Sequence, residues 1–162
     1  MTVSPKILVE RFYHQVWNKA DEAEAHRILH TEFRFRASLG PEHVGPDGFI
    51  TYMRQIHAAL ADYTCTIETL LVEGNRAAAR MSFTGRHQAE FFGIPATGRT
   101  ITWTGGAFFV IDGSQITELW VLGDIDAVKR QLGVGADRGF QEGGEPTDAG
   151  ARQAGSADQA GG

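Results

Sequence analysis

The sequence predicts an α+β fold in which three helices precede a curved antiparallel sheet. In the first 61 residues, apolar side chains mostly recur at three- and four-residue spacing. From residue 63 to residue 122, runs of β-branched and aromatic residues alternate with turn signals. Helices followed by strands, without a repeated strand–helix alternation, are typical of α+β proteins rather than of parallel sheets.

The 162 residues are enough for one domain with a core of its own. We expect residues 1–133 to form this domain. The remaining residues, 134–162, are rich in glycine, and Phe140 is their only large apolar side chain after Val134. We therefore expect a disordered tail over 134–162.

Charge and cysteine content exclude several function classes. The net charge is −5 and basic residues form no run, which argues against nucleic acid and anionic membrane surfaces as partners. Cys65 is the only cysteine, and the N-terminus lacks a signal-peptide pattern, so a cytoplasmic location is expected. His26 and His30 have a metal-site spacing without the rest of such a motif, so we expect no metal.

The helical part begins with clear start signals. Ser4 can cap a helix and Pro5 suits its first turn, while Asp21 is a candidate cap for a second helix. We expect these helices over residues 5–18, 21–30 and 46–61.

The strand part consists of one short strand and two hairpins. The segments 73–75 and 112–113 carry the turn residues that connect antiparallel strands. We expect strands over residues 32–37, 63–72, 76–87, 100–111 and 115–122, with a last helix over 124–132.

The chain has more large aromatic side chains than a thin two-layer core needs. A curved sheet wrapped around helices would turn some of them into the lining of an apolar pocket. The alternative is an ordinary core plus a dimer face. Expected pocket residues are Tyr13, Trp17, His43, Tyr52, Met53, His57, Phe91, Trp103, Phe109, Leu119 and Val121.

Three stretches, residues 12–18, 85–99 and 112–133, together resemble the SnoaL-like polyketide cyclases. This resemblance covers about residues 5–133. It implies the nuclear transport factor 2 fold, a cystatin-like α+β barrel in which a cone-shaped sheet encloses an apolar cavity. It also implies a hydrophobic, polyketide-like substrate, a reaction without a cofactor, and a homodimer or higher oligomer formed through the outer face of the sheet.

The resemblance does not supply a mechanism. In the aldol-type cyclases of the family, an aspartate on the last long strand works with a histidine on the preceding strand. The matching positions here are Val121 and, within one residue, Ala107. Neither can transfer a proton, so other titratable groups are needed for acid–base catalysis.

We expect Asp124 and His87 to be the catalytic groups. Asp124 can alternatively cap the last helix, and His87 can alternatively orient a loop. If they are catalytic, Asp124→Asn and His87→Ala each lower turnover.

Three functions stay open at this point. The first is a cofactor-independent cyclase, or a related isomerase or hydrolase, that preorganises its substrate and moves protons. The second is a binding or accessory protein that keeps the cone and has lost the chemistry. The third is epoxide hydrolysis on the same fold, although related enzymes need an aspartate where Val121 stands.

Overall fold

The computed structural model describes residues 2–38 and 41–134. Apart from Val134, the predicted tail lies outside the described residues. The helical elements are α1 (Pro5–Arg11), the π-helical segment η1 (Phe12–Trp17), α2 (Glu22–Ile28), α3 (Gly45–Ala59) and α4 (Ile125–Gln131). The strands are β1 (Leu29–Arg36), β2 (Glu42–Val44), β3 (Leu60–Glu73), β4 (Arg76–His87), β5 (Thr100–Asp112) and β6 (Gln115–Gly123).

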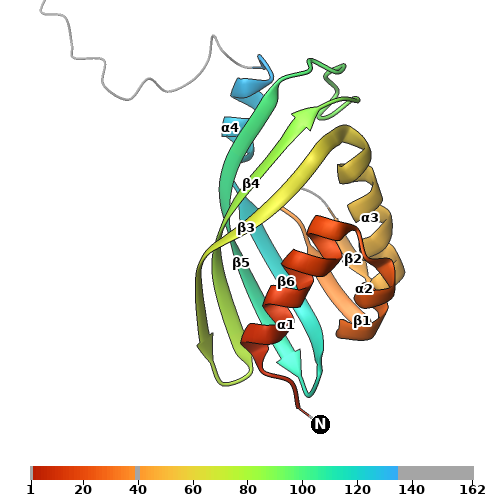
Figure 1. Ribbon diagram of the computed structural model, residues 1–162, viewed down its shortest axis with the longest axis vertical. Helices are drawn as coiled ribbons and strands as arrows, with labels where there is room; N and C mark the ends of the chain where they lie inside the picture. Colours follow the sequence, from red (N-terminus) through yellow and green to blue (C-terminus); the bar gives the residue numbers. More distant parts are fainter. Residues whose placement is uncertain (1, 39–40, 135–162) are drawn as a thin grey trace, which may run out of the picture.

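The strands form one six-stranded sheet in the order β2-β1-β6-β5-β4-β3. The sheet curves strongly, and α1, α2 and α3 cover its inner face, while α4 lies at the end where β5 begins and β4 ends (Figure 1). The α+β class is therefore confirmed. The two predicted hairpins are β3–β4 and β5–β6, both antiparallel.

The sheet is mostly antiparallel, as expected, but one pair is an exception, because β1 runs parallel to β6. These strands are distant in the sequence, so no hairpin turn fixes their relative direction. Strand β2 was also not expected. It has three residues, too few for an alternating pattern to emerge, and Glu42 pairs with Arg34 of β1 across the strands.

The first helix is less regular than its apolar spacing indicates. Its second half is the π-helical segment η1, a form that is rare and often found at functional sites. Ser4 makes no side-chain capping bond, although Pro5 does occupy the first turn. Asp21 caps α2 as expected, accepting a hydrogen bond from the Glu24 backbone N–H at 2.9 Å.

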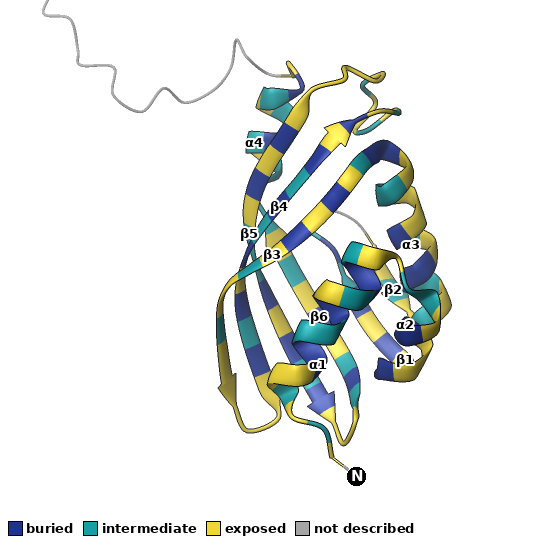
Figure 2. Ribbon diagram, viewed as in Figure 1, coloured by how far each residue is buried: buried dark blue, intermediate teal, exposed yellow. Residues whose placement is uncertain are grey.

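The core lies between the helices and the concave face of the sheet. Buried and exposed residues alternate along the strands, as the period-two geometry of a strand requires (Figure 2). Phe12, Phe49 and Phe109 are fully or almost fully buried, with the Phe12 ring 5.2 Å from Phe49 and 5.7 Å from Phe109. Phe12 of η1, Phe49 of α3 and Phe109 of β5 thus pack helix and sheet together in the core.

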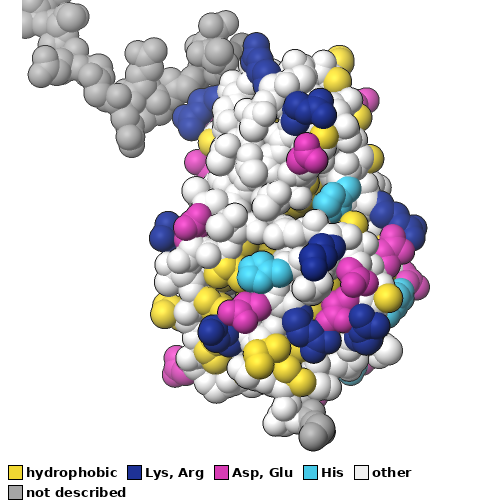
Figure 3. Space-filling view, viewed as in Figure 1, with side chains coloured by type: hydrophobic (Ala, Val, Ile, Leu, Met, Phe, Trp, Pro, Cys, Tyr) yellow, Lys and Arg dark blue, Asp and Glu magenta, His cyan; other side chains and the backbone are white. Residues whose placement is uncertain are grey.

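Acidic and basic side chains are interspersed over the face that carries the helices, with no continuous basic field there (Figure 3). Arg54 of α3 pairs with Glu22 of α2 at 2.6 Å, and Glu24 of α2 is buried against Arg11 and Arg27. The Arg54–Glu22 and Arg11–Glu24 pairs join α2 to α3 and to α1, whereas the Arg27–Glu24 pair lies within α2. Across the described residues, no helix is long and apolar enough to span a membrane.

Candidate functional site

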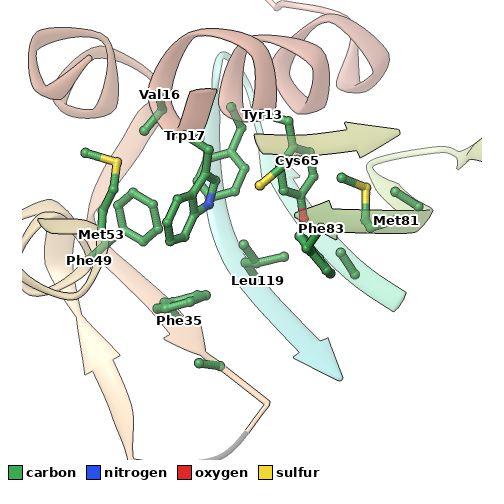
Figure 4. Packing of buried hydrophobic residues seen from close by; sticks show 14 of the residues in the cluster. Tyr13, Val16, Trp17, Phe35, Phe49, Met53, Cys65, Met81, Phe83 and Leu119 are labelled. Carbon is green, nitrogen blue, oxygen red and sulfur yellow. The ribbon is translucent and has the colours of Figure 1, made fainter. Parts of the chain in front are cut away.

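A cavity of about 320 Å³ lies between the helices and the inner face of the sheet. Its wall is mainly aromatic and aliphatic, contributed by η1, α3, β1 and the four long strands. Trp17, Tyr13, Phe35, Phe83 and Leu119 surround a common space between helix and sheet (Figure 4). A concave apolar space with few polar groups is the usual form of a small-molecule site.

Two anchors hold η1 over this space. The Asn18 side chain accepts a hydrogen bond from the Cys65 backbone N–H at 2.8 Å and donates one to the Cys65 carbonyl at 2.9 Å. His57 Nε2 lies 2.8 Å from the Trp17 carbonyl oxygen, which joins η1 to α3. These bonds fix Tyr13 and Trp17 against the cavity.

Three neighbouring strands build one aromatic wall. Tyr63 of β3, Phe83 of β4 and Trp103 of β5 lie side by side, with ring centroids 5.9 Å apart for Tyr63–Trp103 and 5.4 Å for Phe83–Trp103. Their planes are within about 31° of parallel. Such a wall suits a flat or conjugated ligand, because stacked aromatic contacts add to the burial of apolar area.

All three tyrosines of the chain line the cavity: Tyr13, Tyr52 and Tyr63. Burial raises the pKa of Tyr13 and of Tyr63 well above the usual value, with the nearby Cys65 thiol acting in the same direction. Burial also raises the pKa of Tyr52 to about 12. The three phenols therefore stay protonated at neutral pH and can act as hydrogen-bond donors.

Three polar residues of the lining were not expected from the sequence: Ser38, Gln55 and Glu90. Ser38 Oγ accepts a hydrogen bond from the Gly123 backbone N–H at 2.6 Å. Glu90 stands in the irregular segment between β4 and β5, where no periodicity indicates which side chains face inward. Its position beside the expected pocket residue Phe91 was the available signal.

Seven of the expected pocket residues do line the cavity: Tyr13, Trp17, Tyr52, Phe91, Trp103, Leu119 and Val121. Four do not. Met53 is fully buried in the core, and Phe109 packs behind Tyr13 at a ring distance of 5.9 Å. His57 lies against the Trp17 carbonyl, and the His43 ring stacks on the lining residue Phe35 at a centroid distance of 6.0 Å without lining the cavity itself.

His87, expected to be catalytic, is fully buried and does not line the cavity. Its Nδ1 accepts a hydrogen bond from the Thr97 backbone N–H at 3.2 Å and lies 3.0 Å from Thr97 Oγ1. Its backbone pairs with Gly98 and Arg99. These hydrogen bonds connect His87, just before the 88–99 loop, to Thr97–Arg99 near its end, so His87 holds the two ends of the loop close to each other.

Asp124, the other expected catalytic group, is exposed and also outside the cavity lining. Its carboxylate accepts a hydrogen bond from the Ala127 backbone N–H at 3.0 Å, which caps α4. The next residue, Ile125, does line the cavity. Asp124 thus fixes where α4 begins and, through it, where Ile125 lies.

The two positions that the resemblance assigns to an acid–base pair face each other. Val121 of β6 and Ala107 of β5 are partners in the strand register. Val121 lines the cavity and Ala107 is fully buried. The two positions are therefore adjacent on neighbouring strands, but neither side chain can carry a proton.

The chain matches the SnoaL-like polyketide cyclase family over residues 7–132. It belongs to this family. Solved structures agree with that assignment. TsrD from Streptomyces laurentii is 30% identical, with a TM-score of 0.70, over 79% of this chain and 93% of TsrD.

More distant structures share the fold of this SnoaL-like protein. A candidate SnoaL-like polyketide cyclase from Jannaschia sp. CCS1 is 17% identical, with a TM-score of 0.75, over 80% of this chain and 92% of that chain. IdmH, a candidate polyketide cyclase from Streptomyces antibioticus, is 23% identical, with a TM-score of 0.71, over 82% of this chain and 100% of IdmH. Among curated proteins, none matches this chain.

Proposed function

We propose that this SnoaL-like protein is a cofactor-independent cyclase that closes a ring in a hydrophobic, polyketide-like small molecule. The observation that carries the proposal is the cavity itself: about 320 Å³, walled by stacked aromatic rings and supplied with three protonated tyrosines. A flexible chain folded against such a wall loses its conformational freedom before the reaction, which can supply several kcal/mol of the barrier reduction.

The tyrosines support the proposal because their hydroxyl groups can stabilise charge that develops on the substrate. A phenol that donates a hydrogen bond to a substrate carbonyl stabilises the negative charge that develops there during ring closure. Burial strengthens such a bond, because little water competes for it. Tyr13, at the end of the cavity held by η1, is the preferred donor.

Asp124 and His87 enter this proposal as positioning residues. Asp124 places α4 and its Ile125, and His87 places the 88–99 loop that carries Glu90, Phe91 and Phe92. Ring closure by attack of a hydroxyl on an unsaturated carbonyl fits the cavity as well as carbon–carbon closure, since both need the same carbonyl stabilisation.

A non-catalytic binding protein is the second candidate. Val121 and Ala107 favour it, because the facing positions on β6 and β5 hold only aliphatic groups. Epoxide hydrolysis ranks third, because a water-activating carboxylate at position 121 is missing.

We also propose that the protein forms a homodimer through the outer face of the sheet. Leu71, Ala78, Phe108, Trp120 and Arg36 are successive register partners on five adjacent strands. Leu71, Phe108 and Trp120 are 67%, 53% and 40% exposed. The four apolar members, Leu71, Ala78, Phe108 and Trp120, form a continuous row of the kind that is characteristic of a protein–protein interface.

Deletion of the gene in its native host tests the catalytic function. The deletion strain is complemented with the wild-type gene or with a Val121→Trp variant that fills the cavity. We expect an uncyclised or differently cyclised precursor to accumulate on deletion and to disappear only with the wild-type gene. An unchanged small-molecule profile on deletion would contradict the proposal and favour the binding protein.

A further inference from the structure

The cavity of the described structure contains very few groups that can exchange a proton. Its titratable lining residues are three tyrosines and Glu90, and no Lys, Arg or His among the described residues lines it. The tyrosines hold their protons at neutral pH, so they can donate hydrogen bonds but cannot accept a proton. An acid–base reaction in this space needs an acceptor, and a carboxylate is one.

The position of Glu90 is defined by anchors on both sides. Before it, the backbone N–H groups of Gln88 and Ala89 donate to the Ala59 carbonyl at the end of α3, at 2.9 and 3.3 Å. After it, Phe91 and Ile94 exchange two backbone hydrogen bonds of 3.0 Å in a tight turn. Glu90 is thus held between two fixed points rather than on a free loop.

Glu90 lies at the entrance of the cavity. It is exposed, as are the lining residues Gln55 and Phe92, whereas Tyr13, Trp17 and Tyr63 are buried. No hydrogen bond or ion pair joins its carboxylate to another described residue, so its oxygens are available to a ligand. The cavity therefore has a proton acceptor at its mouth and hydrogen-bond donors further inside.

We propose that Glu90 is the catalytic residue that moves the proton during ring closure, in place of the pair absent at Val121 and Ala107. This inference rests on the proposed cyclase function. It assigns the substrate an orientation: the nucleophilic hydroxyl or acidic C–H group lies at the entrance, and the acceptor carbonyl lies inside, near the tyrosines.

For a hydroxyl that adds to an unsaturated carbonyl, the steps balance without any co-reactant. The Glu90 carboxylate takes the hydroxyl proton while the oxygen forms a bond to the β-carbon. The π-electron pair moves to the α-carbon and carbonyl oxygen, where a tyrosine hydroxyl donates a hydrogen bond to the enolate. Protonated Glu90 then returns the proton to the α-carbon, so the product is an isomer of the substrate.

The lining also restricts the substrate class. With an acidic group at the mouth and no cation in the described lining, a substrate with a free carboxylate would be repelled and left without a counter-charge. We therefore infer a substrate without a free carboxylate.

The test uses the full-length protein and the precursor isolated from the deletion strain as its probe. Wild type, Glu90→Gln and the control Glu32→Gln, which changes an exposed carboxylate of β1, are compared for kcat and KM. Binding is followed separately by quenching of Trp17 and Trp103, in a Trp120→Phe background where both remaining tryptophans line the cavity.

We expect Glu90→Gln to bind the precursor as tightly as wild type and to lose about 100-fold in kcat, the usual contribution of general acid–base catalysis. Glu32→Gln should match wild type. A Glu90→Gln variant with wild-type kcat would overturn the Glu90 assignment while leaving the cyclase function intact. Wild-type protein that binds the precursor and does not convert it would overturn the cyclase function and the Glu90 role together.

Discussion

The buried tyrosine hydroxyls define the chemistry that the cavity offers. Each phenol loses its hydration on folding, which penalises the charged form and raises its pKa. Because Tyr13, Tyr52 and Tyr63 are the only tyrosines, any tyrosine signal of the native protein reports on this cavity alone.

Titration of the native protein should therefore show no tyrosinate absorbance at pH 10, where the unfolded chain is about half ionised. The unfolded chain releases protons from about pH 10 upward and the folded chain does not, so the free energy of unfolding falls as the pH rises above that value. The Cys65 thiol, whose pKa burial raises to about 12, acts in the same direction.

Denaturation in guanidinium at pH 8 and pH 11 measures this loss, and Tyr52→Phe should reduce it. Tyrosinate absorbance near pH 10 in the folded protein would contradict the burial of these phenols.

An aspartate at position 124 suits either a helix cap or an acid–base catalyst. We predict that Asp124→Ala lowers the free energy of unfolding by about 1 kcal/mol, whereas Asp124→Asn, which also caps helices well, stays near wild type. Thermal and chemical denaturation of both variants check this. If Asp124→Asn lost turnover while its free energy of unfolding stayed unchanged, the Asp124 carboxylate would have a direct catalytic role.

At the scale of elements, the 88–99 loop connects the fold to the cavity entrance. His87 at its base bonds to Thr97, and the Lys129 amino group of α4 lies 5.6 Å above the Phe92 ring. Phe92 has a positive φ of 51°, a conformation unfavourable for a bulky residue, which the flanking turn imposes.

We predict that His87→Ala frees this loop. The variant should lose about 1–3 kcal/mol of stability, because the Thr97 N–H loses its partner. It should raise KM more than it lowers kcat, since the loop forms the entrance. Hydrogen exchange of residues 88–99 and steady-state kinetics measure the two effects. A fall in kcat without faster hydrogen exchange in residues 88–99 would instead indicate that the His87 imidazole takes part directly in the reaction.

The strands could be predicted from the sequence more fully than the first helix. Segment 76–87 was predicted with the bounds that β4 has, because turn residues bracket an alternating run. The π-helical form of η1 could not be predicted, since residues 12–17 have the same apolar spacing in either kind of helix.

For the site, the sequence indicated the aromatic lining but not the polar groups. Tyr13 and Trp17 follow from an apolar stripe, whereas Glu90 depends on the path of an irregular loop fixed by contacts with Ala59. Met53 and Phe109 were expected in the lining but are packed in the core instead. Apolar patterning identifies the inner face, and only the three-dimensional curvature decides which inward residues meet empty space.

In the whole molecule, the two faces of the sheet differ in what they present. The inner face encloses the cavity, and the outer face carries the row from Leu71 to Trp120. The Phe108 and Trp120 rings lie 5.7 Å apart, and the Arg36 guanidinium lies 4.8 Å from the Trp120 ring. A partner that covered this row would bury it without closing the cavity.

We predict that Phe108→Asp converts the dimer into a monomer, because an unpaired carboxylate would be buried in the interface. Ile7→Asp is the matched control, since Ile7 is a 48% exposed apolar residue on α1. Light scattering coupled to size-exclusion chromatography gives the mass of each variant. A wild-type monomer, or a Phe108→Asp dimer, would contradict the proposed interface.

The proposed cyclisation takes place in the aromatic-walled cavity. The most direct measurement compares conversion of the isolated precursor by wild type, Val121→Trp inside the cavity and Trp120→Phe on the outer face, after thermal unfolding has confirmed that each variant is folded. We expect wild-type conversion by Trp120→Phe and a loss of roughly 100-fold or more in Val121→Trp, because the substrate can no longer reach its reactive position. Conversion by folded Val121→Trp at the wild-type rate would show that the reaction does not take place in this cavity.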